Sequence, residues 1–208
     1  MPPVLPFPAL ETTLPNGLRI IALNTGYPNL VSLQIPVQTG SRNEVESGKS
    51  GFAHFFEHMM FRGTERFPAE AYQEVITRAG ARQNAYTTDD YTNYHITFAK
   101  EDLEQIIELE ADRFMNLRYI ADIEDMPNQF EYSRTFFERW YRPEYATVII
   151  AGDIDPEAAT AMVEKHWSSW RPGSGTPVPV PPEPAQSAPV VVHHRWDSPT
   201  LPWVTIGF

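Results

Sequence analysis

The order of the apolar segments is the feature that most constrains the fold of this chain. Segments with the length and alternation of β-strands are mixed with segments of helical spacing, and the two kinds neither alternate strictly nor separate into two halves. This order is typical of an α+β fold in which helices pack on one face of a largely antiparallel sheet. We expect strands at residues 18–23, 30–37, 82–88, 91–99, 145–152, 190–194 and 202–208, and helices at residues 53–61, 68–79, 101–117, 129–141 and 156–167.

The length of 208 residues suits one domain. We therefore expect a single domain over 1–208, with an extended arm at 1–9 and a Pro-rich linker inside the domain at 172–189. The last apolar segment stops at Phe208, which leaves a strand without a following partner. This ending suggests that the domain is truncated, or that further chain or another subunit completes the sheet.

Composition and charge exclude several classes of protein. Apolar residues make up 42% of the chain, with 12 Phe, 9 Tyr and 5 Trp, which is too aromatic for a disordered chain. Sixteen basic against 27 acidic residues give a net charge of −11, which repels nucleic acid. No apolar run approaches the roughly 20 residues that span a bilayer, and the first ten residues have no basic export signal. We expect a soluble protein without membrane contact, in the cytoplasm, or in the periplasm if a signal was removed.

The sequence His54-x-x-Glu57-His58 is the strongest candidate for a chemical site. The two histidines are four residues apart in a predicted helix rich in Phe and Met, which we expect to be largely enclosed by protein. This spacing places both imidazoles on one side of the helix about 6 Å apart, so both can reach one ion. The chain has no cysteine, so His, Asp and Glu are its only metal ligands. The alternative is that these histidines are hydrogen-bonded core residues, although two of them in a buried helix are costly without a partner.

Zinc is the ion that suits this site. It binds imidazole and carboxylate ligands and lowers the pKa of water to about 7. Glu57 leans over the same side of the helix, where it can act as the general base that takes a proton from water. The expected reaction is hydrolysis of an amide bond.

Four blocks of sequence resemble the inverted zincins of the pitrilysin, insulin-degrading enzyme and mitochondrial processing peptidase family. They occur in the family's order and read GFAHFFEHMMFRGTERFP, RQNAYTTDDYTNYHITF, ELEADRF and FFERWYRPEYATVIIAGDID. The resemblance implies that His54 and His58 bind zinc and that Glu57 is the general base. It also implies that Asn84, Ala85 and Tyr86 belong to an edge strand that pairs with a peptide substrate, although an ordinary hairpin strand explains the same residues.

The chain departs from this family in two ways. The third ligand of the family is a glutamate roughly 75 residues after the second histidine, which here lands near Ser133 and Arg134. Relative to longer family members, the resemblance implies that about fifty residues are missing between Leu117 and Ile123. Family members also use a second, similar half to close the site, and this chain resembles a shortened first half only. Carboxylates that could replace the lost ligand, or that only cap helices or face solvent, are Glu104, Glu108, Glu110, Glu124 and Glu131.

Two functions follow from these observations. The first is a zinc endopeptidase module that hydrolyses peptide bonds in extended peptides, with a second half or subunit as its partner. The second is a non-catalytic peptide-binding or assembly subunit, or an inactive remnant, because two protein ligands hold zinc weakly.

Overall fold

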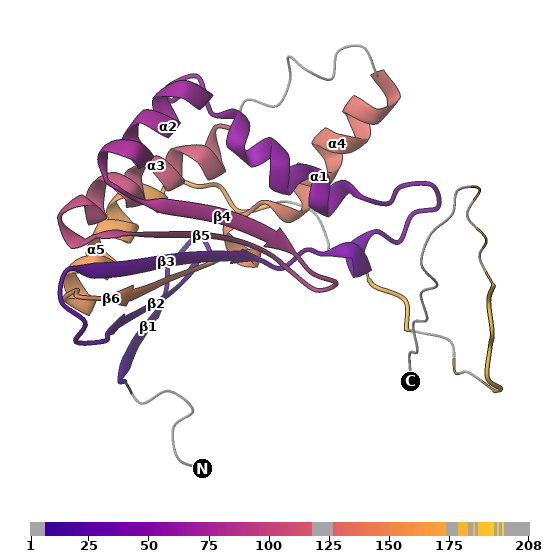
Figure 1. Ribbon diagram of the computed structural model, residues 1–208, viewed down its shortest axis with the longest axis horizontal. Helices are drawn as coiled ribbons and strands as arrows, with labels where there is room; N and C mark the ends of the chain where they lie inside the picture. Colours follow the sequence, from indigo (N-terminus) through magenta and orange to yellow (C-terminus); the bar gives the residue numbers. More distant parts are fainter. Residues whose placement is uncertain are drawn as a thin grey trace.

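A six-stranded mixed sheet forms the base of the structure, a computed structural model (Figure 1). The structure describes residues 7–117, 127–173, 179–182, 185, 187–193, 195 and 197, with residues 127–131 described by their backbone only. Among these described residues, the order across the sheet is β1-β2-β6-β3-β5-β4, and only the β2–β6 pair is parallel. The sheet is therefore largely antiparallel, as predicted. The strands are β1 (Ala9–Thr13), β2 (Arg19–Asn24), β3 (Leu30–Val37), β4 (Arg82–Thr87), β5 (Thr92–Ala99) and β6 (Thr147–Gly152).

Helices gather on one face of this sheet (Figure 1). The strands send alternate apolar side chains toward them, as in β3, where Val31, Leu33, Ile35 and Val37 are buried and the residues between them are half-buried. This one-sided arrangement confirms the α+β prediction. The helices are α1 (Phe52–Met59), α2 (Ala69–Arg78), α3 (Leu103–Met115), α4 (Pro127–Trp140) and α5 (Pro156–Trp167), with short 3₁₀ turns η1 (Ser41–Asn43), η2 (Met60–Arg62), η3 (Lys100–Asp102) and η4 (Pro143–Tyr145).

Aromatic side chains fill the space between the helices and the sheet. Phe56 of α1 stacks on Phe136 of α4, with ring centroids 5.8 Å apart. Tyr94 of β5 meets Phe114 of α3 edge to face, and Phe114 contacts Trp167 of α5. These residues of α1, α3, α4 and α5 belong to one core, and α1 contacts β4 and β5.

Several predictions at the two ends of the chain are wrong or are not tested by the structure. The extended arm was predicted to reach residue 9, but β1 begins at Ala9, and residues 1–6 lie outside the described residues. The strand predicted at 190–194 is wrong for 190–193, since this described segment is not in a strand and Val190, Val191 and Val192 are more than 70% exposed. The strand predicted at 202–208 lies outside the described residues. The single-domain boundary and the linker at 172–189 stay predictions.

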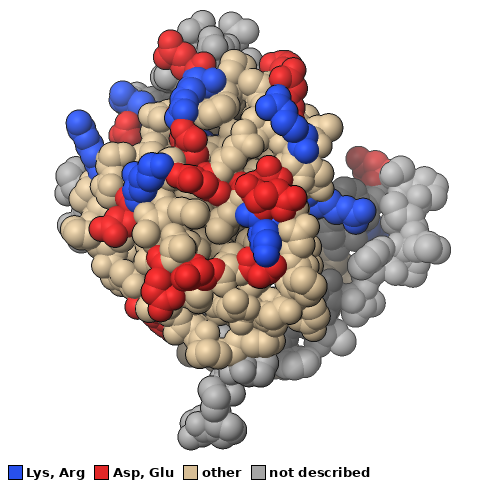
Figure 2. Space-filling model, turned by 90° about the vertical axis from the view of Figure 1, so that its left-hand side faces the viewer, with Lys and Arg blue, Asp and Glu red and all other residues tan. Residues whose placement is uncertain are grey.

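The surface carries charges of both signs. In the view of Figure 2, acidic and basic side chains are interspersed. Ion pairs contribute to this mixture, among them Arg66 with Glu108 and Lys165 with Glu104. Among the described residues, no helix has the length and apolarity needed to cross a membrane.

Candidate metal centre

Helix α1 is anchored by a carboxylate from the loop that precedes it. Glu44 accepts hydrogen bonds from the backbone N–H groups of Gly51 and Ala53, at 2.6 and 2.8 Å. Free N–H groups at a helix start carry partial positive charge, so an ionised carboxylate stabilises them. Gly51 has a φ of 91°, a left-handed conformation that favours glycine. The loop and the first turn of the helix are therefore fixed together.

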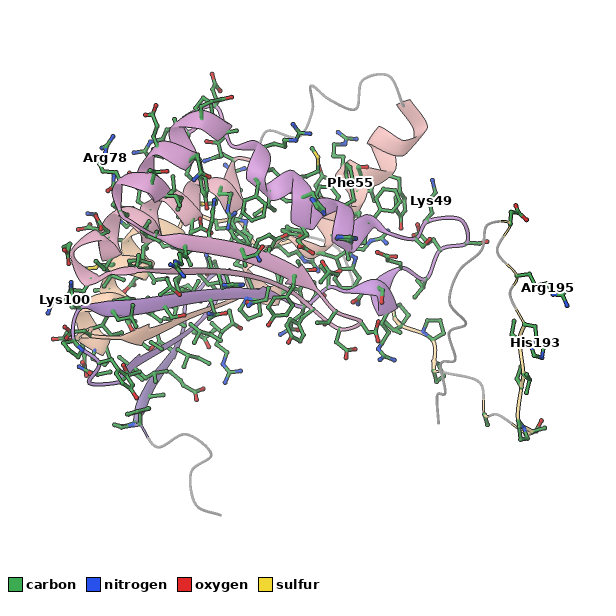
Figure 3. All side chains as sticks on the ribbon, in the orientation of Figure 1. Lys49, Phe55, Arg78, Lys100, His193 and Arg195 are labelled. Atoms are coloured by element: carbon green, nitrogen blue, oxygen red, sulfur yellow. The ribbon has the colours of Figure 1, made fainter. Side chains whose placement is uncertain are left out.

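Helix α1 is amphipathic, which corrects the expectation that it is largely enclosed. Ala53, Phe56 and Met59 are buried, whereas His54 and His58 are exposed. The reason is that the sheet and α4 cover only one side of the helix, and the four-residue spacing keeps both histidines on the other side. Phe55, labelled in Figure 3, is half-buried on the same helix. The two histidines are thus not hydrogen-bonded core residues.

The side chains of His54 and His58 face each other. Their Nε2 atoms are 3.1 Å apart and their ring centroids 4.9 Å apart. Two nitrogens that bind one tetrahedral zinc at about 2.0–2.1 Å are about 3.3 Å from each other. The separation and the donor type therefore fit a shared zinc ion, with little movement of either ring.

Glu57 lies between the histidines in sequence and is fixed by the neighbouring strand. Its Oε2 atom accepts a hydrogen bond of 2.6 Å from the Thr87 hydroxyl, at the end of β4. The Glu57 side chain is half-buried, and the histidines on either side of it are exposed. Sequence reasoning identified Glu57 but missed Thr87 and Glu44. The alternation of the strand was the available signal for Thr87, because it places this side chain on the same face as the buried Ala85.

The described residues contain no cluster of three His, Asp or Glu side chains that could hold a metal. Glu124 and the side chain of Glu131 lie outside the described residues. The other three candidate carboxylates have partners elsewhere, which argues against them as replacements for the missing ligand. Glu104 contacts Lys165 and His166, Glu108 pairs with Arg66, and Glu110 binds Arg113 and Tyr72. His193 lies on a segment drawn away from α1 in Figure 3.

Strand β4, which carries Asn84, Ala85 and Tyr86, is at the edge of the described sheet. The N–H of Thr88 donates to the Tyr91 carbonyl at 2.8 Å across the hairpin. Backbone N–H and C=O groups alternate in direction along a strand. Those of Tyr86 and Asn84 therefore also point toward β5, and those of Ala85 point to the open edge. The N–H of Ala85 agrees with this, since it donates to the Asn84 side chain at 2.9 Å.

Two buried tyrosines lie beneath the candidate centre. The hydroxyls of Tyr94 and Tyr141 are 2.7 Å apart. Burial raises the pKa of both groups well above the ordinary value, and the charge of Glu57 adds to this rise. Both tyrosines therefore remain neutral at ordinary pH, and one hydroxyl donates a hydrogen bond to the other.

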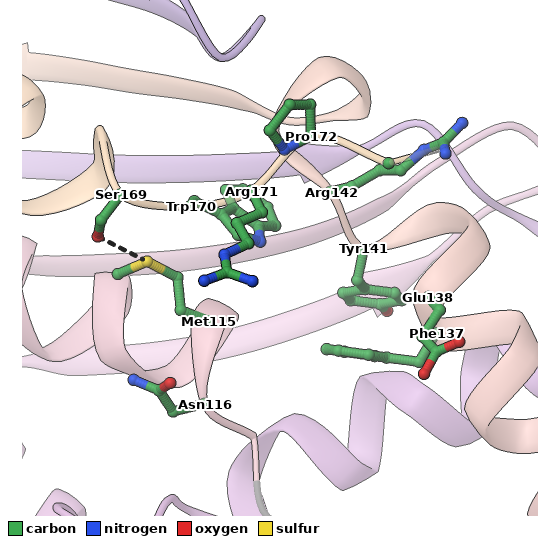
Figure 4. A pocket seen from close by; sticks show the side chains of 11 residues that line it. Met115, Asn116, Phe137, Glu138, Tyr141, Arg142, Ser169, Trp170, Arg171 and Pro172 are labelled. Atoms are coloured by element: carbon green, nitrogen blue, oxygen red, sulfur yellow. Dashed lines mark hydrogen bonds between the residues drawn. The ribbon is translucent and has the colours of Figure 1, made fainter. Parts of the chain in front are cut away.

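A pocket of about 550 Å³ opens between the ends of α3 and α4 and the segment after α5 (Figure 4). Its lining includes Met115 and Asn116 at the end of α3, Phe137 of α4, Tyr141 directly after α4, and Arg171. The lining does not include any residue of the His-x-x-Glu-His sequence. This pocket is thus separate from the candidate metal centre.

Comparison with known proteins gives the family. A family model described as insulinase, peptidase family M16, matches residues 19–125, and one described as the M16 inactive domain matches residues 129–208. The zinc protease PqqE of Helicobacter pylori is 26% identical over 249 residues, covering 95% of this chain and 56% of that protein. Subunit 1 of the rat cytochrome b-c1 complex is 34% identical over 106 residues, covering 51% of this chain and 22% of that protein.

The solved structure of a Helicobacter pylori protease has the same fold. Its TM-score is 0.76 at 22% identity, and the match covers 84% of this chain and 53% of that chain. The chain thus spans about half, or less, of the length of these proteins. In the PqqE alignment, 95% of 208 residues is about 198, so about 50 of the 249 positions have no residue in this chain.

That difference agrees in size with the missing segment predicted between Leu117 and Ile123. The two family models meet between residues 125 and 129, a few residues after this point. The matched residues include the whole of α1 and β4, and therefore His54, Glu57, His58 and the edge strand. This chain belongs to the insulinase family, peptidase family M16.

Proposed function

We propose that this chain is a zinc-dependent endopeptidase module that acts on extended peptides. One observation carries the proposal: His54 and His58 face each other with Nε2 atoms 3.1 Å apart, on the helix that also carries Glu57. Family membership supports it, because the similar Helicobacter pylori protein is named a zinc protease. His54 and His58 would hold zinc, which when bound supplies a Lewis acid for the water and the scissile carbonyl.

The residues of the chain supply the remaining steps. Glu57 takes a proton from the attacking water at its carboxylate and then gives it to the leaving amine. Ala85, with Asn84 and Tyr86 on either side, binds the peptide backbone at the open edge of β4, which holds the substrate extended beside α1. For this to happen, the Asn84 side chain must leave the N–H of Ala85, which it occupies in the structure.

A second half is part of the proposal. The chain spans 53% of the solved Helicobacter pylori protease. The two histidines are exposed rather than enclosed, so a further domain or subunit is needed to exclude water from the site. We therefore expect low turnover from the chain alone.

A non-catalytic subunit is the second candidate. It is favoured by the described residues, in which His54 and His58 have no third metal ligand beside them. Two protein ligands bind zinc less tightly than three. The similarity to a subunit of the rat cytochrome b-c1 complex supports an assembly role of this kind.

A peptidase assay separates the two candidates. The zinc-loaded chain is incubated with an unstructured peptide, alone and with the remaining part of a related two-half protease. If the chain is an endopeptidase module, the rate of peptide cleavage rises when the second half is added, and cleavage is lost in Glu57→Gln. Cleavage that is absent in both cases, or that survives Glu57→Gln, contradicts the endopeptidase function.

A further inference from the structure

We propose that Thr87 is a positioning residue that fixes the orientation of the Glu57 side chain and links this orientation to the peptide-binding edge of β4. This inference rests on the proposed function. The Thr87 hydroxyl and Glu57 Oε2 are 2.6 Å apart, which is the distance of a strong hydrogen bond to an ionised acceptor. Thr87 is half-buried, so this bond is partly protected from water.

The Thr87 hydroxyl donates to Glu57, and the neighbouring hydroxyl of Thr92 has a different acceptor. Thr92, which pairs with Thr87 across the hairpin, donates its own proton to the buried Thr39 carbonyl at 2.9 Å. The Thr87 and Thr92 oxygens are 3.3 Å apart. Each hydroxyl has one proton, so a Thr87 that donates to Glu57 cannot also donate to Thr92. A hydrogen bond from a hydroxyl fixed on the strand holds the Glu57 Oε2 atom at one place beside β4.

The backbone of Thr87 faces the open edge. Thr88 is paired across the hairpin through its N–H, so the groups of Thr87 point away from β5, as those of Ala85 do. A peptide that extends the sheet at this edge would therefore contact the Thr87 backbone, while the Thr87 side chain holds Glu57. One residue thereby connects substrate position with the orientation of the base.

Three variants test this assignment in the full chain. Thr87→Val keeps the shape but removes the hydroxyl, and Thr87→Ser restores it. Thr97→Val is the matched control, because Thr97 lies on β5 with its side chain on the opposite face of the sheet. Thermal unfolding of each variant shows that it folds.

The first measurement needs neither metal nor activity. The infrared carboxylate bands of the metal-free protein are recorded, and the band of Glu57 is identified by its loss in Glu57→Gln. We expect Thr87→Val to shift this band, and Thr87→Ser and Thr97→Val to leave it unchanged. An unshifted band in a folded Thr87→Val overturns the inference.

The second measurement uses the zinc-loaded chain with its second half. Loss of a hydrogen bond to a charged group corresponds to about a 10- to 100-fold lower kcat. We expect this loss in Thr87→Val with little change in KM, and rescue by Thr87→Ser. Equal kcat in Thr87→Val and Thr97→Val overturns the positioning role. If the wild-type chain shows no turnover that depends on Glu57, the proposed function fails, and the infrared band alone decides whether Thr87 holds Glu57.

Discussion

At the scale of single residues, the candidate centre depends on side chains that hold other side chains. His54 and His58 are oriented by the spacing of α1, Glu57 by Thr87, and the start of the helix by Glu44. Glu44 is seven residues before Gly51, in a loop whose path the sequence does not reveal. For this reason the His-x-x-Glu-His pattern could be found in the sequence, and the residues that support it, Thr87 and Glu44, could not.

Glu44→Ala should destabilise the chain. It leaves the N–H groups of Gly51 and Ala53 without their acceptor, and loss of a helix cap costs about 1–2 kcal/mol. Urea denaturation measures the free energy of unfolding of each variant. The control is Glu74→Ala, which removes an exposed glutamate from α2. Equal stability of the two variants would show that Glu44 does not anchor α1.

Arg113→Leu should lower the stability of the fold far more than replacement of both Arg113 and Glu110. Arg113 and Glu110 form a fully buried ion pair, and Arg113 also lies over the ring of Tyr94. Breaking such a pair leaves an uncompensated charge and costs about 3–5 kcal/mol, whereas replacing both charges is often nearly neutral. Unfolding of the single variant and of Glu110→Leu/Arg113→Leu tests this. A double variant as unstable as the single one would contradict it.

Tyr132 should make stability fall at alkaline pH. Burial, with a hydrogen bond to Glu46, raises its pKa to about 12 in the folded chain. The unfolded chain therefore releases this proton at lower pH, so the stabilisation is present below about pH 10 and is lost between about pH 10 and 12. Urea midpoints across this window should decline less in Tyr132→Phe than in the wild type. Parallel declines would assign the effect to other tyrosines.

At the scale of elements, the sequence predicts most of the helices and strands, but less of how they pair and pack. The spacing of apolar residues in β3 and α5 was clear in the sequence, and the predicted bounds of both elements agree with the structure. Strand β1 was missed because it is a short edge strand with few apolar residues. The parallel pairing of β2 with β6 joins segments more than 100 residues apart, which local patterns cannot specify. The exposure of α1 depends on which neighbours cover it.

The open edge of β4 gives a prediction about peptide backbones. In an added strand, only every second residue of the peptide turns its N–H toward the edge. We expect N-methylation at alternate positions of a bound peptide to weaken binding about tenfold or more, and N-methylation at the intervening positions to have little effect. Fluorescence anisotropy of labelled peptides measures both series. Equal losses in the two series would argue against strand addition.

At the scale of the whole molecule, this chain is a shortened first half of an M16 protein. The PqqE alignment contains about 50 positions without a residue here, and the family models meet between α3 and α4. The helix that carries His54 and His58 and the edge strand β4 both lie within the residues matched by the first family model.

The central claim is that His54 and His58 bind zinc, and a metal titration tests it most directly. Zinc is added to metal-free protein in competition with a chromophoric chelator, for the wild type, Glu57→Gln and His54→Ala/His58→Ala. We predict one zinc per chain for the wild type and Glu57→Gln, with an affinity weaker than that of a three-ligand site, and no stoichiometric zinc for the double variant. Unchanged zinc binding in His54→Ala/His58→Ala would contradict the account.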